Sequence, residues 1–235
     1  MTAWVETLVS HAHDCVNERV REALWARGAA DSQIEAFRIG YVNRELPPAE
    51  YPKAFLDWSG NGAKLADSFL LPLTNTLGEV LGFQFRAVER EVSGYMDFFL
   101  NRAEPIFFGL GSAMESVWKT ETVLLVEGGF DFFPVQRFVP HSFPTLTAKV
   151  SEPLLRTLKR LVRRLHIFYD ADQTGRKAGD KFMKDHGGEF EAVRLIEYPR
   201  GVTLPNGKPI KDPGELWEAW GDDRFGSFLQ AQMES

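Results

Sequence analysis

The pattern of apolar residues divides the chain into a helical start, a strand-rich middle and an alternating last third. Residues 3–27 place apolar side chains near helical spacing, and Gly28 supplies a stop, so one long amphipathic helix is predicted there. A shorter helix is predicted around Ser32, which stands three residues before Glu35 in the spacing of a capping box. Between residues 68 and 108, two apolar runs around the letters NTLG predict a β-hairpin followed by further short strands.

In the last third, short apolar runs alternate with amphipathic stretches. The expected strands are residues 122–126, 166–169 and 192–196, and the expected helices are residues 152–164 and 175–184. Strands that alternate with helices are typical of a parallel sheet, because each parallel pair needs a crossover connection. The fold class predicted for this part is therefore α/β.

Composition limits the kind of protein. The chain has 235 residues, 44% of them hydrophobic and 19 of them Phe, which is enough for one large domain or two small ones. No apolar run reaches the roughly 18 residues that span a bilayer, and no secretion leader is visible, so we expect a cytoplasmic protein without a membrane partner. Cys15 is the single cysteine, which excludes a disulfide framework and a cysteine zinc ribbon.

The charge is distributed unevenly along the chain. A net charge of −6 counts against nucleic-acid binding if it is taken as a whole, since binders usually show a basic footprint. Residues 151–184, however, hold nine Lys or Arg against four Asp or Glu. A basic zone inside an acidic protein leaves the binding of a polyanion open.

A first acidic motif follows the predicted strand 122–126. Glu127 ends the apolar run, two glycines make a turn, and Asp131 comes four residues later. In open α/β sheets, ligands bind outside the carboxyl ends of the strands, where Glu127 would stand. An ordinary solvent-facing Glu, with Asp131 capping the next helix, fits this motif equally well.

A second acidic motif favours the functional interpretation. Asp170 and Asp172 end another apolar strand, and a strand period of two points both carboxylates to the same side. Such neighbours repel each other unless a cation lies between them, and Mg²⁺ suits one or two carboxylates. An EF-hand calcium loop is excluded, because its twelfth position should be Glu and is Lys181, and because a strand precedes the motif.

The two motifs together resemble the TOPRIM domain of bacterial primases, topoisomerases and some nucleases. The resemblance implies that Glu127, Asp170 and Asp172 are catalytic and bind Mg²⁺ or Mn²⁺. It also implies that Asp131 and Asp212, the latter in the phrase IKDPGEL, belong to the metal site. Primases usually have a second Asp two residues after the position of Asp212; this chain has Gly214 there and then Glu215, whose role the motif leaves open.

Further motifs resemble DnaG-type primases over residues 27–215. The phrase ARGAADSQIEAFRIGYV, the hairpin with Gly82, Phe83 and Arg86, and the segment with Asn101 and Pro105 carry this resemblance. It implies a TOPRIM domain, Rossmann-like with a mostly parallel sheet, preceded by a mixed α+β primase-like N-terminal subdomain. The expected boundaries are 1–118 for that subdomain, 119–217 for the TOPRIM domain and 218–235 for a C-terminal helical tail.

Two positions depart from the primase pattern. Phe98 and the segment 107–109 stand where primases usually carry lysines that would hold template backbone and nucleotide phosphates. Other polar and basic residues close to the motifs would then bind nucleotide or DNA. They are Arg86, Asn101, Arg102, Lys149, Arg176 and Lys177.

The function that the resemblance implies is a primase-like nucleotidyltransferase that makes short primers on single-stranded DNA by two-metal phosphoryl transfer. Its partners would be a single-stranded DNA template and nucleoside triphosphates, with a replicative helicase or a separate zinc-binding module as further candidates. Two alternatives stay open: a metal-dependent TOPRIM nuclease, and a non-catalytic, replication-associated DNA-binding module.

Overall fold

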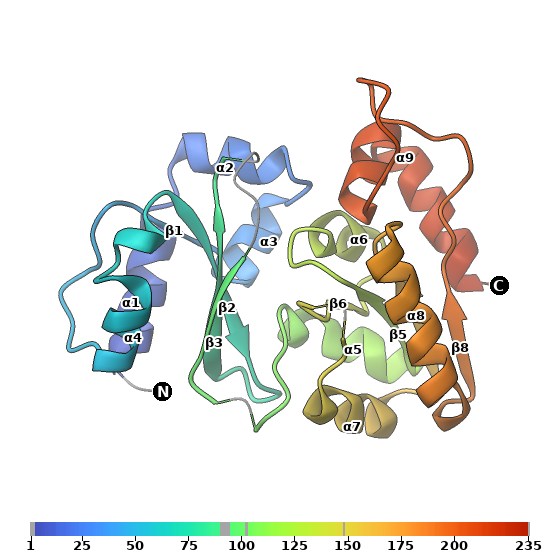
Figure 1. Ribbon diagram of the computed structural model, residues 1–235, viewed down its shortest axis with the longest axis horizontal. Helices are drawn as coiled ribbons and strands as arrows, with labels where there is room; N and C mark the ends of the chain where they lie inside the picture. Colours follow the sequence, from blue (N-terminus) through green and yellow to red (C-terminus); the bar gives the residue numbers. More distant parts are fainter. Residues whose placement is uncertain (1–2, 90–94, 102, 148, 235) are drawn as a thin grey trace. The chain divides into compact units, whose positions relative to one another are not determined.

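The computed structural model describes residues 3–89, 95–101, 103–147 and 149–234 (Figure 1). Its internal contacts divide the chain into two compact units. The first unit is Met1–Ala26 with Ala30–Phe108, and the second is Arg27–Ala29 with Gly109–Ser235. The boundaries expected from the sequence, 118/119 and 217/218, stay a prediction, because a subdomain is defined by its independent folding.

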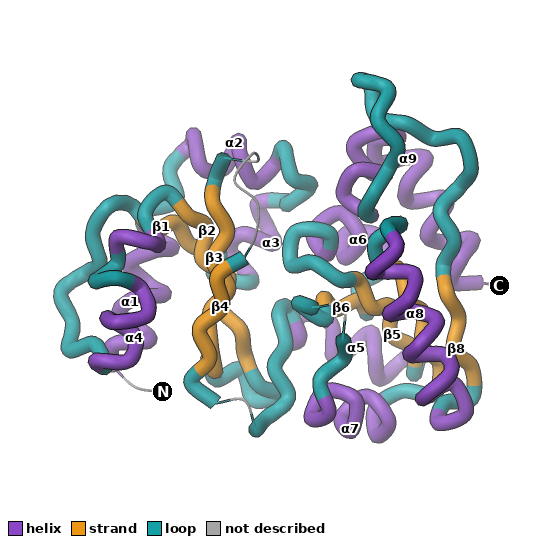
Figure 2. Tube along the Cα trace, viewed as in Figure 1, coloured by secondary structure: helices purple, strands orange, loops and turns teal. Residues whose placement is uncertain are grey.

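The first unit contains an antiparallel sheet in the order β1-β2-β3-β4 (Figure 2). Its strands are β1 (Gly40–Val42), β2 (Ser68–Thr74), β3 (Val80–Ala87) and β4 (Met96–Phe99). The hairpin predicted around NTLG is confirmed, because β2 pairs with β3 directly across that turn. The Asn75 side-chain oxygen accepts hydrogen bonds from the Leu77 and Glu79 backbone N–H groups, and Gly78 takes the positive φ of 80° that completes the turn.

This unit also contains short helices, and two of them, α1 (Ala3–Asp14) and α4 (Lys53–Ser59), form an aromatic core with the sheet. The others are α2 (Glu18–Trp25), α3 (Asp31–Ala36) and the 3₁₀ turn η1 (Ala63–Leu65). Trp4 of α1 lies 5.1 Å from Phe55 of α4 and 5.9 Å from Phe83 of β3, measured between ring centroids. This cluster of rings fixes α1 and α4 against β3.

Two helix predictions for the first unit were wrong in detail. The stretch 3–27 forms two helices, because the Asn17 side chain accepts a hydrogen bond from the Val20 backbone N–H and so starts a new helix. The predicted capping box at Ser32 is absent, because α3 begins after Ala30: the Gln33 side chain accepts a hydrogen bond of 2.9 Å from the Ala30 backbone N–H, and Ala30 has no side-chain oxygen to return one.

The second unit contains a parallel sheet in the order β6-β5-β7-β8, which confirms the α/β prediction. Its strands are β5 (Thr122–Val126), β6 (Ser142–Pro144), β7 (Arg164–Phe168) and β8 (Ala192–Leu195). Every residue of β5 is buried, as expected for a central strand covered on both faces. From β5 the chain goes first to β6 on one side and then to β7 on the other. This change of direction is the switch point at which α/β sheets usually bind ligands.

Helices connect and cover this sheet. They are α5 (Leu110–Thr120), α6 (Phe132–Phe138), α7 (Glu152–Leu161), α8 (Gln173–His186), the 3₁₀ turn η2 (Gly187–Glu189) and α9 (Pro213–Glu234). The helix α9 is kinked at Gly221, which has a φ of 70°, and it packs against α6 through Phe225 and Phe138, 6.0 Å apart. None of the helices in the described part of the chain is both long and apolar enough to cross a membrane.

The predicted end of α7 and start of β7 were also wrong by a few residues. Helix α7 ends at Leu161, and Val162 already has extended backbone, with φ −133° and ψ 151°. The backbone N–H groups of Arg163 and Arg164 donate to the Glu121 carbonyl oxygen, beside the start of β5. Sheet pairing therefore takes up two residues that the sequence pattern assigned to the helix.

Candidate metal centre

The carboxyl edge of the parallel sheet brings Glu127 and Asp170 together. Val126, the last residue of β5, pairs in register with Phe168, the last residue of β7, so the residues that follow these strands leave the sheet side by side. The Asp170 backbone N–H donates to the Glu127 carboxylate. Parallel register thus places the two acidic motifs, far apart in sequence, at one point of the fold.

Asp131 and Asp212 form a second pair at this edge. The Asp131 Oδ2 accepts a hydrogen bond of 3.1 Å from the Gly128 backbone N–H, which closes the turn after β5. A methyl group on Gly214 would lie 3.3 Å from Asp212 Oδ1 and 3.4 Å from Asp131 Oδ1. The two carboxylates therefore flank a common point, at the position where the primase pattern has another Asp.

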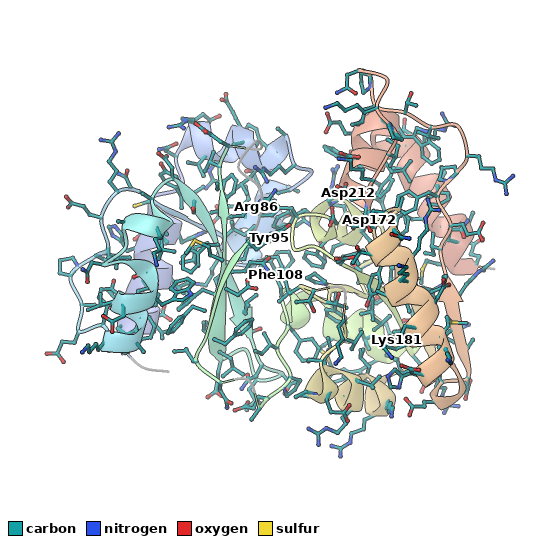
Figure 3. The ribbon with its side chains drawn as sticks, viewed as in Figure 1. Arg86, Tyr95, Phe108, Asp172, Lys181 and Asp212 are labelled. Carbon is teal, nitrogen blue, oxygen red and sulfur yellow. The ribbon has the colours of Figure 1, made fainter. Side chains whose placement is uncertain are left out.

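Asp172 lies at the start of α8 and also has a structural role (Figure 3). Its exposed side chain caps the helix, because Oδ1 accepts a hydrogen bond of 2.8 Å from the Gly175 backbone N–H. Gly175 in turn packs against Asp170: a Cβ there would overlap the Asp170 carbonyl oxygen and lie 2.9 Å from its nitrogen. The spacing Asp-x-Asp-x-x-Gly is thus a condition for starting α8 directly above the end of β7.

Burial and mutual repulsion raise the pKa of the clustered carboxyl groups. Burial is the larger cause for Asp170 and raises its pKa to about 8, with Glu127, Asp212 and Asp172 adding to the shift. Burial also raises the pKa of Asp212 to about 6, and raises the pKa values of Glu127 and Asp131. Four carboxyl groups at one edge therefore resist ionisation together.

Two carboxylate oxygens of this cluster have no partner within the described part of the chain. Glu127 Oε2 and Asp170 Oδ1 are buried and accept no hydrogen bond there. Unsatisfied carboxyl oxygens are costly in a protein interior, and a hard divalent cation that displaces their protons satisfies them. The all-oxygen donor set thus fits Mg²⁺ or Mn²⁺. The side chains are gathered without being closed around an ion: among the described residues, no three His, Cys, Asp or Glu side chains are arranged to hold a metal.

Glu215 has a local structural role that the sequence left open. Its Oε2 accepts a hydrogen bond of 2.7 Å from the Lys211 backbone N–H, while its own backbone N–H donates to Asp212 Oδ1. This reciprocal pair is a capping arrangement at the start of α9. Glu215 still adds negative charge, because its proximity helps to raise the pKa values of Asp170 and Asp212.

The basic candidates fall into both units. Arg176, Lys177 and Lys149 belong to the second unit and have exposed side chains. Arg176 lies close to the carboxylates: its Nε donates a hydrogen bond of 2.7 Å to the Ala171 carbonyl oxygen, between Asp170 and Asp172. Lys149 belongs to the loop before α7, where its carbonyl oxygen accepts a hydrogen bond from the Thr147 hydroxyl.

The remaining candidates are in the first unit. The guanidinium carbon of Arg86 lies 4.7 Å from the centroid of the Tyr95 ring (Figure 3). The Asn101 side chain closes its own loop by donating to Glu104 and accepting from the Ala103 backbone N–H. Arg102 lies outside the described residues.

Tyr198 is a site residue that sequence reasoning missed. It follows β8 at the same edge of the sheet, and within the described residues its buried hydroxyl has no hydrogen-bond partner. Burial raises its pKa well above the usual value, and Asp131, Asp170 and Asp212 raise it further. The only signal in the sequence was its place just after a predicted strand, which is where Glu127 and Asp170 also stand.

The arrangement of elements matches a known fold. It is the fold of the DnaG catalytic core: a solved structure described by that name aligns with 97% of this chain and 78% of its own, with a TM-score of 0.76 and 17% identity. The structure of a DnaG primase catalytic domain bound to single-stranded DNA aligns over 97% of this chain and 79% of its own, with a TM-score of 0.73 and 17% identity.

Sequence comparison finds similarity to bacterial DNA primases. The DNA primase of Lactococcus lactis subsp. lactis is 24% identical over 208 residues, which cover 80% of this chain and 32% of that primase. The chain thus spans about a third of the length of the curated primases it matches. No protein-family model matches it.

Proposed function

We propose that this chain is a primase-like nucleotidyltransferase that makes short primers on single-stranded DNA with divalent metal. The observation that carries the proposal is the set of carboxylates at the switch point of the parallel sheet, with unpartnered oxygens on Glu127 and Asp170. The likeness to bacterial DNA primases and to a DnaG domain bound to single-stranded DNA supports the substrate class. A replicative helicase and a separate zinc-binding module are the partners that this proposal expects.

The residues of the cluster suit this chemistry. Glu127, Asp170 and Asp172 would hold the metal, and Asp131 and Asp212 would support them. When bound, a divalent cation neutralises phosphate oxygens and makes a 3′-hydroxyl more acidic. The chain holds these side chains in place beforehand, because Asp131 accepts a hydrogen bond in the turn after β5 and because Asp172 and Asp212 cap α8 and α9.

A metal-dependent nuclease is the second candidate, and one observation favours it. Neither of the two positions where primases usually carry lysines holds a cation here. The ring of Phe98 lies 5.0 Å from that of Phe55 and 5.1 Å from that of Trp58, measured between centroids, and the second position, after Phe107 and Phe108, is Gly109. Other cations must therefore hold a nucleotide, whereas a nuclease needs the carboxylates and no nucleotide site.

One assay separates these functions. The protein is incubated with single-stranded DNA, labelled nucleotides and Mn²⁺ or Mg²⁺, beside the Asp170→Asn variant. We expect elongated products from the wild type and none from the variant. Shortened DNA that depends on Asp170 would mean a nuclease. DNA that is bound and unchanged would mean a binding module, and would contradict the proposed synthesis.

Arg176 and Arg86 are proposed to replace the missing lysines. A charge-assisted hydrogen bond to phosphate contributes about 1.5–3 kcal/mol, so Arg176→Ala or Arg86→Ala should lower nucleotide incorporation or DNA cleavage about tenfold or more. Mn²⁺ binding, measured by calorimetry, should stay unchanged. Lys184→Ala is the matched control for Arg176, because Lys184 is an exposed cation near the other end of α8. Full activity in both arginine variants would place the substrate-binding cations elsewhere.

A further inference from the structure

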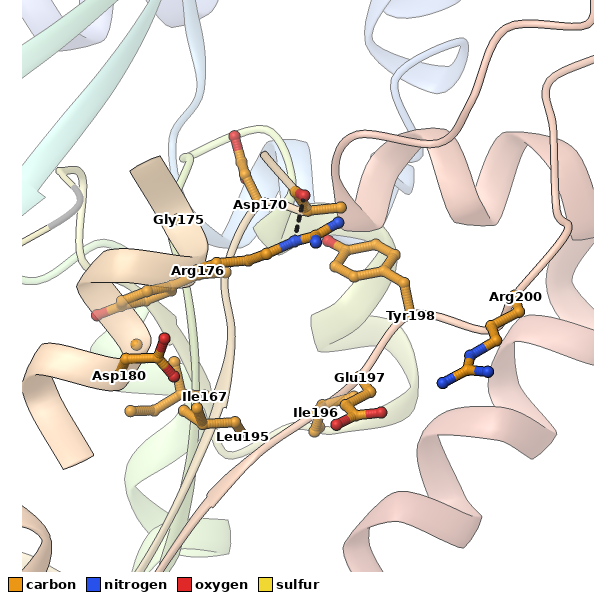
Figure 4. Close-up of a pocket in the computed structure, with 13 residues that line it drawn as sticks. Ile167, Asp170, Gly175, Arg176, Asp180, Leu195, Ile196, Glu197, Tyr198 and Arg200 are labelled. Atoms are coloured by element: carbon orange, nitrogen blue, oxygen red, sulfur yellow. Dashed lines mark hydrogen bonds between the residues drawn. The ribbon is translucent and has the colours of Figure 1, made fainter. Parts of the chain in front are cut away.

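A pocket lies beside the carboxylates, within the second unit (Figure 4). Its volume is about 420 Å³, which falls within the range of small-molecule sites. The end of β7, the first two turns of α8 and the segment 195–200 line it. Asp170 belongs both to this lining and to the carboxylate cluster, so the pocket adjoins the candidate metal centre directly.

Part of the pocket wall is apolar and the rest is polar. Ile167, Leu195 and Ile196 supply the apolar surface. Gly175 and Gly179 expose the backbone of α8 on another wall. Gly179 also lets α8 approach β8, because a Cβ there would lie 3.2 Å from a Leu195 methyl group. The apolar part of the wall can contact the face of a flat ring.

The pocket is also lined by charged side chains of both signs. Arg176 comes from α8, and Arg200 comes from the segment after β8 (Figure 4). Asp180 and Glu197 also line the pocket. The side chains of Arg200, Asp180 and Glu197 make no hydrogen bond or ion pair with any residue that the structure describes. Arg176 is held in place through its Nε bond to the Ala171 carbonyl oxygen.

This mixture limits what the pocket can hold. A bare polyanion would be repelled by Asp180 and Glu197, and a purely apolar molecule would leave these two carboxylates and Arg200 without partners. A nucleoside phosphate provides a flat heterocycle for the apolar part of the wall. Its amino groups and ribose hydroxyls donate to carboxylates, and its phosphate pairs with an arginine.

We propose that this pocket binds a free mononucleotide, with base and ribose inside and the phosphate at Arg200. The base of this nucleotide would contact the pocket wall in place of a template strand, so the occupant is an effector and differs from the templated substrate. Because the pocket shares Asp170 with the carboxylate cluster, an occupied pocket hinders phosphoryl transfer. Binding of the nucleotide is independent of the proposed function. Only the inhibition rests on the proposed function.

Binding is tested on the metal-free protein, without template. Calorimetric titration with the four ribonucleoside monophosphates should show binding of at least one of them at millimolar or lower concentration. Arg200→Ala should weaken it about tenfold or more, through loss of a charge-assisted contact. Arg160→Ala is the matched control, because Arg160 is an exposed arginine of α7 outside the pocket lining, and it should bind as the wild type does.

Two further ligands test separately where the phosphate and the base bind. The nucleoside without phosphate should bind more weakly than the nucleotide, and inorganic phosphate should fail to compete at the same concentration. If the nucleoside binds as tightly as the nucleotide, the phosphate does not contact Arg200. If inorganic phosphate competes as well as the nucleotide, the base does not bind in the pocket. Absence of binding by all four monophosphates would overturn the whole proposal.

The regulatory consequence has a separate readout. Where the wild type extends primers, the monophosphate that binds should inhibit it, and Arg200→Ala should resist inhibition while its basal rate is unchanged. Inhibition of equal strength in both proteins would overturn the effector role. A wild type without synthesis or cleavage would refute the proposed function alone, since metal-free binding is measured without either reaction.

Discussion

In metal-free buffer at pH 8, Asp170→Asn should melt several degrees above the wild type, and this difference should vanish as the pH falls toward 4. The folded protein raises the pKa of Asp170 to about 8, against an ordinary value of about 3.9 in the unfolded chain. A carboxyl whose pKa is raised by folding stabilises the fold below the unfolded pKa. That stability is lost as the pH rises toward the folded pKa.

The expected size of this effect follows from the same linkage. Asp170 is partly accessible to solvent and shares its protons with neighbouring carboxyls, so we expect about 2 kcal/mol at pH 8. In a chain of this length that is roughly 4–8 °C in the melting temperature. Burial also lowers the pKa of His166, to about 4, which destabilises the fold below about pH 6.5 in both proteins and cancels from the comparison.

The same substitution should remove activity. Asp170→Asn should therefore raise the stability of the metal-free protein and lower its activity. Asp170→Asn should lower primer synthesis or cleavage about 100-fold or more, because one of the carboxylates that would hold the metal is lost. Mn²⁺ should raise the melting temperature of the wild type much more than that of the variant. Asp57→Asn, an exposed carboxylate of α4, is the control and should show neither effect. A variant that melts below the wild type at pH 8 would mark Asp170 as a structural residue.

The strand ends were predictable from the sequence, and with them half of the site. The apolar run 122–126 is β5 to the residue, and Glu127 and Asp170 follow strands that neighbour each other in the sheet. A buried parallel strand needs an unbroken apolar run, so its end is visible locally as the first charged residue. The acidic motifs were visible because they begin where such runs stop.

The other half of the site depends on contacts between distant segments. The approach of Asp212 to Asp131 needs the turn before α9 to return to the sheet, and no local pattern encodes this return. Tyr198 and the pocket depend on how closely α8 lies on β8, which Gly179 permits only once both elements exist. The capping role of Asp172 was hidden for another reason: one carboxylate can serve as a helix cap and as a metal ligand, and its spacing fits both.

Gly175→Ala should destabilise the protein by about 2–3 kcal/mol and remove its activity at the same time. An added methyl group would overlap the Asp170 carbonyl oxygen and lie 2.9 Å from the Asp170 nitrogen. Both atoms are backbone, so they cannot rotate away, and the start of α8 has to move from the end of β7. The cap at Asp172, which bonds to the Gly175 N–H, moves with it.

Calorimetry measures the stability of Gly175→Ala and the DNA assay measures its activity, with Gly188→Ala as the matched control. A Cβ at Gly188 meets nothing within 4 Å, so that variant should melt with the wild type or slightly above it and keep its activity. Gly175→Ala should melt roughly 4–12 °C lower and stay inactive well below its own melting temperature. The loss of activity in a folded variant follows from displaced carboxylates, because the substitution adds only a methyl group and changes no charge. A Gly175→Ala protein with the stability and activity of the wild type would show that the close packing of α8 on β7 is not what places Asp170 and Asp172.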